Sequence, residues 1–588
     1  MVSTLTWVLA GLVAYTLLAM ALQSRGVVPE YVRFSGPITT IHTQKGKAVL
    51  NWLARPKRAW RAWGNLGVGF GLVVMVGSFL LVALGAYQAI VDPQPSALNE
   101  PRNALAIPGV NDFLPLSVAP EIVLGLLLGL VVHEGGHGLF CRVEDIDIES
   151  MGLALLAIVP VGAFVEPDED ELLRADRGAQ VRMYTAGVTN NFALALVALL
   201  LLFGPIAGSI AVVDGVPVGG ALRGAPADQA GIGSGDVITA IDGQPVANGQ
   251  ELERALAESD AQTVEVSRRN AAPVTVERSV VVSAALQSAP LGTGDTVVSV
   301  NDSAVATGSG FERAARNHTV ATLQTESGES VTTPLGAYVL VVEDSPLDQA
   351  GGPGGESMII TAVDGQRTHS GSALVDALDG REPGDSVTVV GYVDGQRETF
   401  DVTLGESDTS DDGIVGISIQ RGISGMQVSD FGIDAYPAAA FLEFLGGSPD
   451  APTSVSDFSF AQRVFSTLLL PFIGVAGGFG YNFAGFTGIA ANFFTVEGPL
   501  AALGTTPVFL LANVLFWTGW INLVIGQFNL IPTFPLDGGH ILRAATESFV
   551  SRLPVSDARR LTTAVSVAVT VSMIAGLLLM VFGPRLLA

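Results

Sequence analysis

The stretch VVHEGGHGLF, residues 131–140, places His133, Glu134 and His137 inside an apolar run long enough to cross a lipid bilayer. An ionisable side chain near the middle of a bilayer costs about 2 to 3 kcal/mol even on the lenient insertion scale. Three such residues within five positions therefore need a specific reason to be there.

The spacing of the two histidines supplies that reason. His133 and His137 lie four residues apart, so on an α-helix they share one face and can bind a single zinc ion. Glu134 is offset by one position and lies beside the metal, within reach of a bound water. Zinc lowers the pKa of such a water to about 7, and the glutamate can take its proton. Gly135 and Gly136 each cost about 1 kcal/mol of helix propensity, but they allow another backbone to approach closely.

A catalytic zinc also needs a third protein ligand and an open position. The stretch FNLIPTFPLDGGH, residues 528–540, contains Asp537 directly after an apolar run that Pro532 and Pro535 interrupt. Irregular backbone at membrane depth is tolerated only where it is buried in protein or lines a wet cavity. This places Asp537 at a cavity. The alternative, in which the prolines merely end the run at the membrane surface, is equally compatible with this stretch alone and is disfavoured only when HEGGH is considered with it.

Composition indicates a membrane protein with several domains. The chain has 588 residues, 49% of them hydrophobic, and a mean hydropathy of +0.47, which excludes a purely soluble enzyme. Several runs approach the roughly 20 apolar residues that span a bilayer. They are residues 4–22, 66–91, 119–141, 187–212, 505–528 and 562–583. We therefore expect a polytopic α-helical membrane protein with about six transmembrane helices.

Basic residues predict the orientation of these runs. The segment between the first two runs is rich in Lys and Arg and carries the single acid Glu30, so the positive-inside rule makes it cytoplasmic and the N-terminus external. Counting forward, the HEGGH end of its helix lies toward the cytoplasm, and residues from about 213 to 460 lie outside the cell. The apolar stretch 461–504 must then cross an even number of times, and we expect a re-entrant or interfacial segment, with two short crossings as the alternative.

The net charge of −26 is concentrated in that exterior region, and no lysine follows Lys57. A carboxylate-rich surface stays hydrated in concentrated salt, so the composition resembles that of proteins from extreme halophiles. An acidic surface for a basic partner is the alternative, which the scattering of the acids disfavours. No nucleic-acid partner is expected, and the single cysteine, Cys141, excludes an intramolecular disulfide.

The exterior region contains an internal repeat. GAPADQAGIGSGDVITAIDGQPV (224–246) and DSPLDQAGGPGGESMIITAVDGQRT (344–368) share a Pro-x-Asp-Gln-Ala-Gly order, an apolar β run and an Asp-Gly turn. They resemble PDZ domains over residues 213–283 and 335–405, with 284–334 as a degenerate copy or linker and 406–460 as an acidic linker. PDZ domains can bind peptide C-termini by strand addition; a spacer without a ligand is the alternative.

The two polar stretches together resemble the site-2 protease family of intramembrane zinc metalloproteases. HEGGH is the family's HExxH, and the stretch from Asn529 to Gly538 is similar to its asparagine-proline-LDG motif. The resemblance implies Glu134 as general base and Asn529 as a group that holds the substrate or the developing oxyanion. It ranks Asp537 above the neighbouring His540 and implies that three residues bind Zn²⁺: His133, His137 and Asp537.

Two further stretches carry the same resemblance. TAGVTNNFALAL (185–196) looks like the family's glycine-proline-x-x-asparagine at the head of the next core helix, with Gly187 and Asn191 aligned and Asn191 as a catalytic candidate. Val188 stands where the proline is usual, and the adjacent Asn190 leaves open which asparagine acts. IVPVGAFVEPDEDEL (158–172) is similar to the family's membrane-inserted β-hairpin, whose edge strand can pair with an unwound substrate.

The implied protein is an endopeptidase that cleaves transmembrane segments of single-pass proteins, after another protease has removed their exterior part. Its expected domains are an N-terminal hairpin (1–91), two halves of the protease core (92–212 and 505–588) and the exterior region between them. The alternative is a membrane-anchored PDZ protein with a structural or vestigial metal site, which the presence of Glu134 disfavours. A metal transporter explains neither Glu134 nor the repeats.

Overall fold

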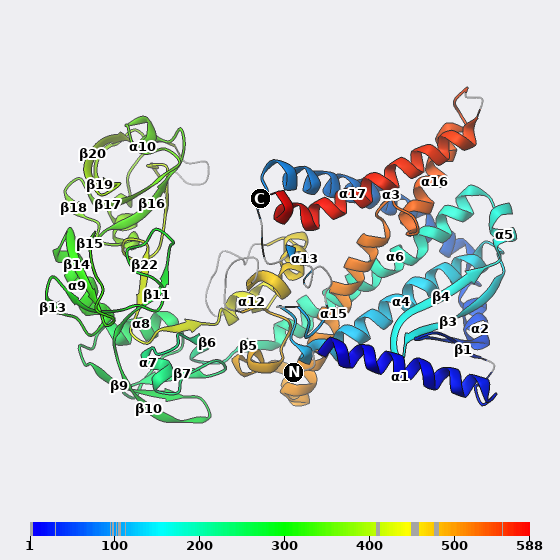
Figure 1. Ribbon diagram of the computed structural model, residues 1–588, viewed down its shortest axis with the longest axis horizontal. Helices are drawn as coiled ribbons and strands as arrows, with labels where there is room; N and C mark the ends of the chain where they lie inside the picture. Colours follow the sequence, from blue (N-terminus) through cyan, green and yellow to red (C-terminus); the bar gives the residue numbers. More distant parts are fainter. Residues whose placement is uncertain are drawn as a thin grey trace. The chain divides into compact units, whose positions relative to one another are not determined.

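The protein consists of two compact units, residues 1–211 with 439–588, and residues 212–438. The computed structural model describes residues 4–587 except 30, 95, 97–98, 101–102, 104–106, 112, 407–411, 448–457, 475–480 and 555–556. The first unit is mainly helical and contains a four-stranded sheet, and the second is built from β-strands and short helices (Figure 1).

Within these described residues, five helices of the first unit are long and apolar enough to cross a membrane. They are α3 (Lys57–Val91), α4 (Ala119–Val143), α6 (Arg177–Leu201), α15 (Thr505–Asn529) and α17 (Ala558–Leu587). The first apolar run forms α1 (Thr4–Ser24), of which Ala10–Ser24 counts as a shorter apolar helix. The predicted fold class, a polytopic helical protein with β domains inserted between its helices, is confirmed.

Two helices begin earlier than hydropathy predicts. Helix α3 begins at Lys57 rather than residue 66, and α6 begins at Arg177 rather than residue 187. The Asp176 side chain caps α6 by accepting a hydrogen bond from the Ala179 N–H at 2.9 Å. The predicted glycine–asparagine motif therefore lies inside α6 and not at its head, because a polar first half that packs within the unit is invisible to an apolar-run criterion.

Helix α4 packs between α6 and α15 through glycines. A Cβ added to Gly125 would lie 3.1 Å from the Trp517 carbonyl oxygen of α15. A Cβ added to Gly129 would lie 3.0 Å from the Asn522 side chain of the same helix. A Cβ on Gly136 would lie 2.9 Å from the Ala186 carbonyl oxygen of α6. Small residues allow this approach, and close packing replaces the hydrophobic effect as the driving force between helices in lipid.

A four-stranded antiparallel sheet of order β1-β2-β3-β4 packs on the same helix. Its strands are β1 (Val32–Ser35), β2 (Ile38–His42), β3 (Ile148–Leu156) and β4 (Val159–Pro167). The hairpin expected over 158–172 is thus displaced: that stretch supplies only β4 and the short helix α5 (Glu169–Arg174), and the partner strand precedes it. Strand β4 is at the edge of the sheet and lies beside α4 (Figure 1).

The C-terminal half returns the chain to α4. After α15 the backbone turns through Pro532 and Pro535, and α16 (Asp537–Val550) begins at Asp537. The stretch before α15 contains only short elements among its described residues: α13 (Phe460–Leu469), β24 (Phe494–Val496) and 3-10 turns. Trp517 and Trp520 of α15 hold it by donating their indole N–H groups to the carbonyls of Ala484 and Leu468, each at 3.1 Å.

The second unit contains three antiparallel sheets with one shared strand order. These orders are β10-β9-β7-β6-β23, β15-β14-β12-β11-β22 and β20-β19-β17-β16-β21, each with one further short strand. Residues 284–334, expected as a degenerate copy or linker, contribute most of the second sheet.

The strands and short helices of the three sheets have the following bounds, in chain order. The first sheet has β6 (Val216–Ala221), α7 (Pro226–Gln229), β7 (Val237–Ile241), β8 (Gln244–Pro245), α8 (Gly249–Ala257), β9 (Thr263–Arg268) and β10 (Ala271–Glu277). The second has β11 (Val280–Ala285), β12 (Thr296–Val300), β13 (Ser303–Ala304), α9 (Gly308–Asn317), β14 (Val320–Thr325) and β15 (Ser330–Pro334). The third has β16 (Ala337–Val341), α10 (Pro346–Gln349), β17 (Ser357–Val363), β18 (Gln366–Arg367), α11 (Gly371–Leu378), β19 (Ser386–Val393) and β20 (Gln396–Thr403).

In each of the three sheets of the second unit, the strand at one edge comes from residues 417–435, here called the closing segment. Strand β21 (Ile417–Ile419) pairs with β16, β22 (Met426–Ser429) with β11, and β23 (Ile433–Ala435) with β6, all antiparallel. Along the chain, the closing segment therefore adds a strand first to the third sheet, then to the second and finally to the first. The prediction of an acidic linker over 406–460 was wrong here, because strands of three or four residues are too short to show a period of two.

A buried ion pair joins the closing segment to the first two sheets. Arg278 is 1% exposed, and its guanidinium donates to Asp430 Oδ2 at 2.9 Å and to the Leu256 carbonyl at the end of α8 at 2.8 Å. Asp430 lies between β22 and β23, and its Oδ1 accepts from the N–H of Gly308 at the start of α9 at 2.7 Å.

We expect Arg278→Ala to lower the free energy of unfolding of the second unit by about 3 to 5 kcal/mol, because Asp430 is left buried without its counter-ion. Arg381→Ala is the matched control, since its pair with Asp364 is 36% and 34% exposed and is worth at most about 1 kcal/mol. Denaturant-dependent hydrogen exchange of residues 212–438 in the full chain measures both. Equal losses in the two variants would contradict the assignment.

Candidate metal centre

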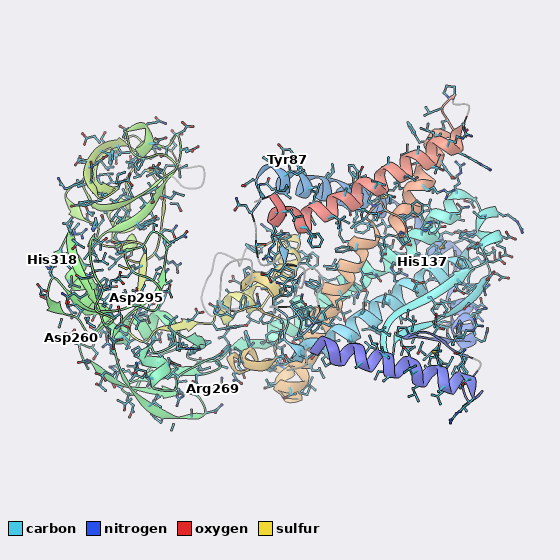
Figure 2. All side chains as sticks on the ribbon, viewed as in Figure 1. Tyr87, His137, Asp260, Arg269, Asp295 and His318 are labelled. Carbon is cyan, nitrogen blue, oxygen red and sulfur yellow. The ribbon has the colours of Figure 1, made fainter. Side chains whose placement is uncertain are left out.

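Three side chains from two helices meet inside the helical unit. His133 and His137 extend from one face of α4, with their Nε2 atoms 3.2 Å apart. Asp537 Oδ2, from the first residue of α16, lies 3.1 Å from His133 Nε2 and 3.4 Å from His137 Nε2. Figure 2 shows His137 within this unit. The sequence-predicted trio is therefore brought together, and in the described part of the chain it is the group whose atoms could hold a metal ion.

Backbone and amide groups orient both imidazoles. His137 Nδ1 lies 2.8 Å from the Met183 carbonyl of α6, so Nδ1 carries the proton and Nε2 keeps its lone pair for a metal. His133 Nδ1 lies 3.3 Å from Asn191 Nδ2, while the buried Asn191 Oδ1 has no hydrogen-bond partner among the described residues. If His133 binds metal through Nε2, its Nδ1–H needs an acceptor. Turning the Asn191 amide over satisfies both groups.

The two neighbouring asparagines have different contacts. Asn191 is fully buried beside His133, whereas Asn190 accepts a hydrogen bond from the Trp63 indole at 3.0 Å. Gly187, one turn before Asn191, allows α6 to reach the site: an added Cβ would lie 2.6 Å from His137 Nε2 and 2.9 Å from the His133 carbonyl oxygen. Of the two asparagines, Asn191 is thus the one that contacts His133.

The Asp537 carboxylate fits a metal ligand better than a hydrogen-bond acceptor. Its Oδ2 is buried and makes no hydrogen bond of acceptable geometry, although two imidazole nitrogens face it. A buried carboxylate oxygen left in this state is costly unless a cation satisfies it. Two imidazoles and one carboxylate are the donor set of catalytic zinc sites, which keep a fourth position open. The residues present therefore fit a zinc ion.

Glu134, next to His133 in the chain, is not one of the three grouped ligands. It is half-buried on the side of α4 that packs against the sheet, and its Oε2 accepts a hydrogen bond from the Val165 N–H of β4 at 3.1 Å. Sequence reasoning missed this contact and the Met183 carbonyl, because backbone atoms leave no mark in the identity of a residue.

Two further candidates lie outside the trio. Asn529 is the half-buried last residue of α15, and none of the hydrogen bonds of the described residues joins it to the three candidate ligands. His540 stacks on Tyr184 with ring centroids 4.7 Å apart and contacts the Phe534 ring at 5.2 Å. His540 is therefore an aromatic packing partner, in agreement with its lower rank as a ligand.

The adjacent glycines of HEGGH differ sharply in their surroundings, which yields a matched prediction. A Cβ on Gly136 would meet α6, whereas a Cβ on Gly135 has no atom within 4 Å. We expect Gly136→Ala to separate α4 from α6 and to lower bound metal at least tenfold, as loss of supporting contacts does elsewhere (about 10- to 100-fold). Gly135→Ala should leave bound metal unchanged. Metal analysis of the purified variants checks this, and similar losses in both would contradict it.

The model of peptidase family M50 matches residues 121–573. A stretch of 174 residues is 30% identical to an uncharacterized protein of Methanocaldococcus jannaschii and covers 29% of this chain and 44% of that protein. A stretch of 196 residues is 29% identical to a membrane-bound transcription factor site-2 protease homolog of Arabidopsis thaliana, covering 31% and 35% of the two chains.

A shorter stretch of 56 residues is 38% identical to a protein of Mycobacterium tuberculosis named as a zinc metalloprotease, Rip3, and covers 10% and 14% of the two chains. The matched stretches thus span less than half the length of each of these relatives. The family model, in contrast, extends over well more than half of this chain and includes both helices that carry the candidate ligands. The chain belongs to peptidase family M50.

Proposed function

We propose that the protein is an intramembrane zinc endopeptidase that cleaves transmembrane segments of single-pass membrane proteins. The observation that carries this proposal is the convergence of His133, His137 and Asp537 between helices that are themselves long enough to span a bilayer. Burying three ionisable groups at such a depth is costly, and a shared metal ion offsets that cost.

A zinc ion held by these three residues would polarise the scissile carbonyl and lower the pKa of a water. Glu134 would accept a proton from the attacking water on its carboxylate and pass it to the nitrogen of the leaving amine, as the new C–O bond forms and the C–N bond breaks. Asn191 and the Met183 carbonyl contact the Nδ1 atoms of the two imidazoles, whose Nε2 atoms lie near Asp537 Oδ2 and would hold the ion together with it. In this proposal Asn529, at the end of α15, holds the substrate or its developing oxyanion.

The substrate would bind in an extended form along β4. The carbonyls of a helix are shielded by its own hydrogen bonds, so a transmembrane helix must unwind before its peptide bond can be attacked. Strand β4 pairs with β3 along one edge, and its other edge lies beside α4, where Val165 N–H contacts Glu134. Strand addition at this edge would place a peptide next to the proposed general base.

The remaining assignments of the proposal concern orientation and the second unit. The basic segment before α3 favours a cytoplasmic location for that segment, a metal centre toward the cytoplasm and a second unit outside the cell. The three sheets would be PDZ-like domains that bind peptide C-termini or limit substrate size, with an acidic surface adapted to high salt. Residues 461–504 would form a re-entrant or interfacial segment, supported by their packing on α15.

The competing function is a membrane-anchored binding protein with a structural metal site. A structural zinc site is usually closed by four protein ligands, whereas three candidate ligands converge in the described part of this chain. Glu134 stands one position from a ligand, which a purely structural site does not require. Both features favour the enzyme.

Metal content tests the proposed ligand set. We expect Asp537→Ala to reduce bound zinc from about one ion per chain to near zero, because two imidazoles alone hold zinc weakly. His540→Ala, three residues away on the same helix, should retain the metal because its ring packs on Tyr184. Elemental analysis of both purified variants measures this. Zinc retained in Asp537→Ala would exclude that residue as a ligand.

Glu134→Gln separates catalysis from metal binding. The amide preserves the shape of the side chain but cannot take a proton, so cleavage of a tethered transmembrane helix in high salt should fall by about 10²- to 10⁴-fold with zinc retained. Glu134→Asp, which keeps the carboxylate on a shorter side chain, should recover part of the rate. Undiminished cleavage by Glu134→Gln would remove Glu134 as the base and with it the proposed mechanism.

A further inference from the structure

The free edge of β4 presents backbone N–H groups at alternate residues. In an antiparallel pair, successive residues point their N–H groups alternately toward the partner strand and away from it. Val165 is paired with Met151 of β3, but its N–H points to Glu134 and hence away from the sheet. By the same alternation, Ala163, paired with Leu153, directs its N–H to the same edge. No strand covers this edge in the part of the chain that the structure describes.

Packing holds the Val165 N–H in place against α4. The Val165 side chain packs into the core that contains Leu50 and Leu139. Gly138, one turn after Glu134 on the same face of α4, allows the close approach, since an added Cβ would lie 3.3 Å from a Val165 methyl group. The contact between Val165 N–H and Glu134 is therefore a consequence of how β4 packs on the helix, and not a chance meeting of surface groups.

The single N–H of Val165 cannot form a full hydrogen bond to Glu134 and to a substrate carbonyl at the same time. A peptide that adds to the free edge of β4 and extends to Val165 brings one of its carbonyls to the N–H that Glu134 now occupies. Among the described residues, no hydrogen bond or ion pair joins the Glu134 carboxylate to His133, His137 or Asp537. In this state the Glu134 Oε2 atom is hydrogen-bonded to the sheet.

We propose that the Val165 N–H is a positioning group that holds Glu134 on β4 until a substrate strand displaces it. The inference rests on the proposed peptidase function and specifies its regulation: an extended substrate that fills the edge releases the general base, and a peptide too short to reach Val165 leaves it held. Helices that remain wound in the bilayer would then meet an enzyme whose base is not available. The enzyme would therefore preferentially cleave transmembrane segments that unwind over several residues.

The test removes the N–H without removing the strand. Proline lacks the N–H and is tolerated on an edge strand where that group faces outward. Full-length, zinc-loaded enzyme in lipid vesicles is given two probes: a single-pass model helix with a glycine-rich extended stretch, and a soluble fluorogenic tetrapeptide. We expect Val165→Pro to raise kcat for the tetrapeptide about tenfold, the effect of losing one hydrogen bond to a charged group, and to lower kcat/KM for the helix.

Two matched variants separate holding of the base from binding of the substrate. Ala163→Pro removes an outward N–H that does not contact Glu134, so it should lower kcat/KM for the helix without any gain for the tetrapeptide. Val165→Ala keeps the N–H but loses part of the side-chain packing, so any loss it shows should fall equally on both probes and leave their ratio unchanged. Equal reduction of kcat for both probes by Val165→Pro, or an unchanged ratio between them, would overturn the inference.

The wild-type chain provides a second route if Val165→Pro does not retain zinc. Substrates whose extended stretch is lengthened one residue at a time should show a step in kcat at the length that reaches Val165. A change confined to KM would overturn the coupling. Failure of the wild type to cleave either probe would overturn the proposed function and this inference together, whereas cleavage with no step overturns only this inference.

Discussion

The membrane unit depends on the mutual burial of two imidazoles and one carboxylate between packed helices. Each group alone would be costly at this depth, but their ligand atoms lie within 4.8 Å of one another, and a cation between them satisfies all three. The glycines follow from this constraint. Gly136 and Gly187 bring α4 and α6 close enough for α6 to orient the rings of His133 and His137.

Helix α4 contacts other helices with one face and strand β4 with another. His133, Gly136 and His137 face α6 and α16, where the candidate metal ligands are assembled. Glu134 and Gly138 face β4, where backbone and not side chains forms the contact. Neighbouring residues of a helix point in different directions, so Glu134 can lie next to the two histidines and still contact β4. The edge strand can therefore influence the base without touching the ligands.

In the second unit, the main constraint is that the open edges of three sheets must be covered. Each of its sheets would expose unpaired backbone groups next to β6, β11 or β16, and exposed edges invite pairing with other chains. The closing segment covers all three in turn, and Arg278 with Asp430 anchors it where the first two sheets meet. Because these pairings join residues far apart in the chain, loop closure must occur before the closing strands contribute stability.

Local chemistry in the sequence determined the candidate ligands and most of the membrane helices. Helical spacing alone puts His133 and His137 together, the prolines before Asp537 indicate a break at depth, and long apolar runs identify α3, α4, α15 and α17. Only the tertiary structure decided which asparagine contacts His133, which strand pairs with β4 and where the closing strands come from. Those features depend on backbone atoms and on pairings between distant segments, and neither is encoded in the identity or the spacing of neighbouring residues.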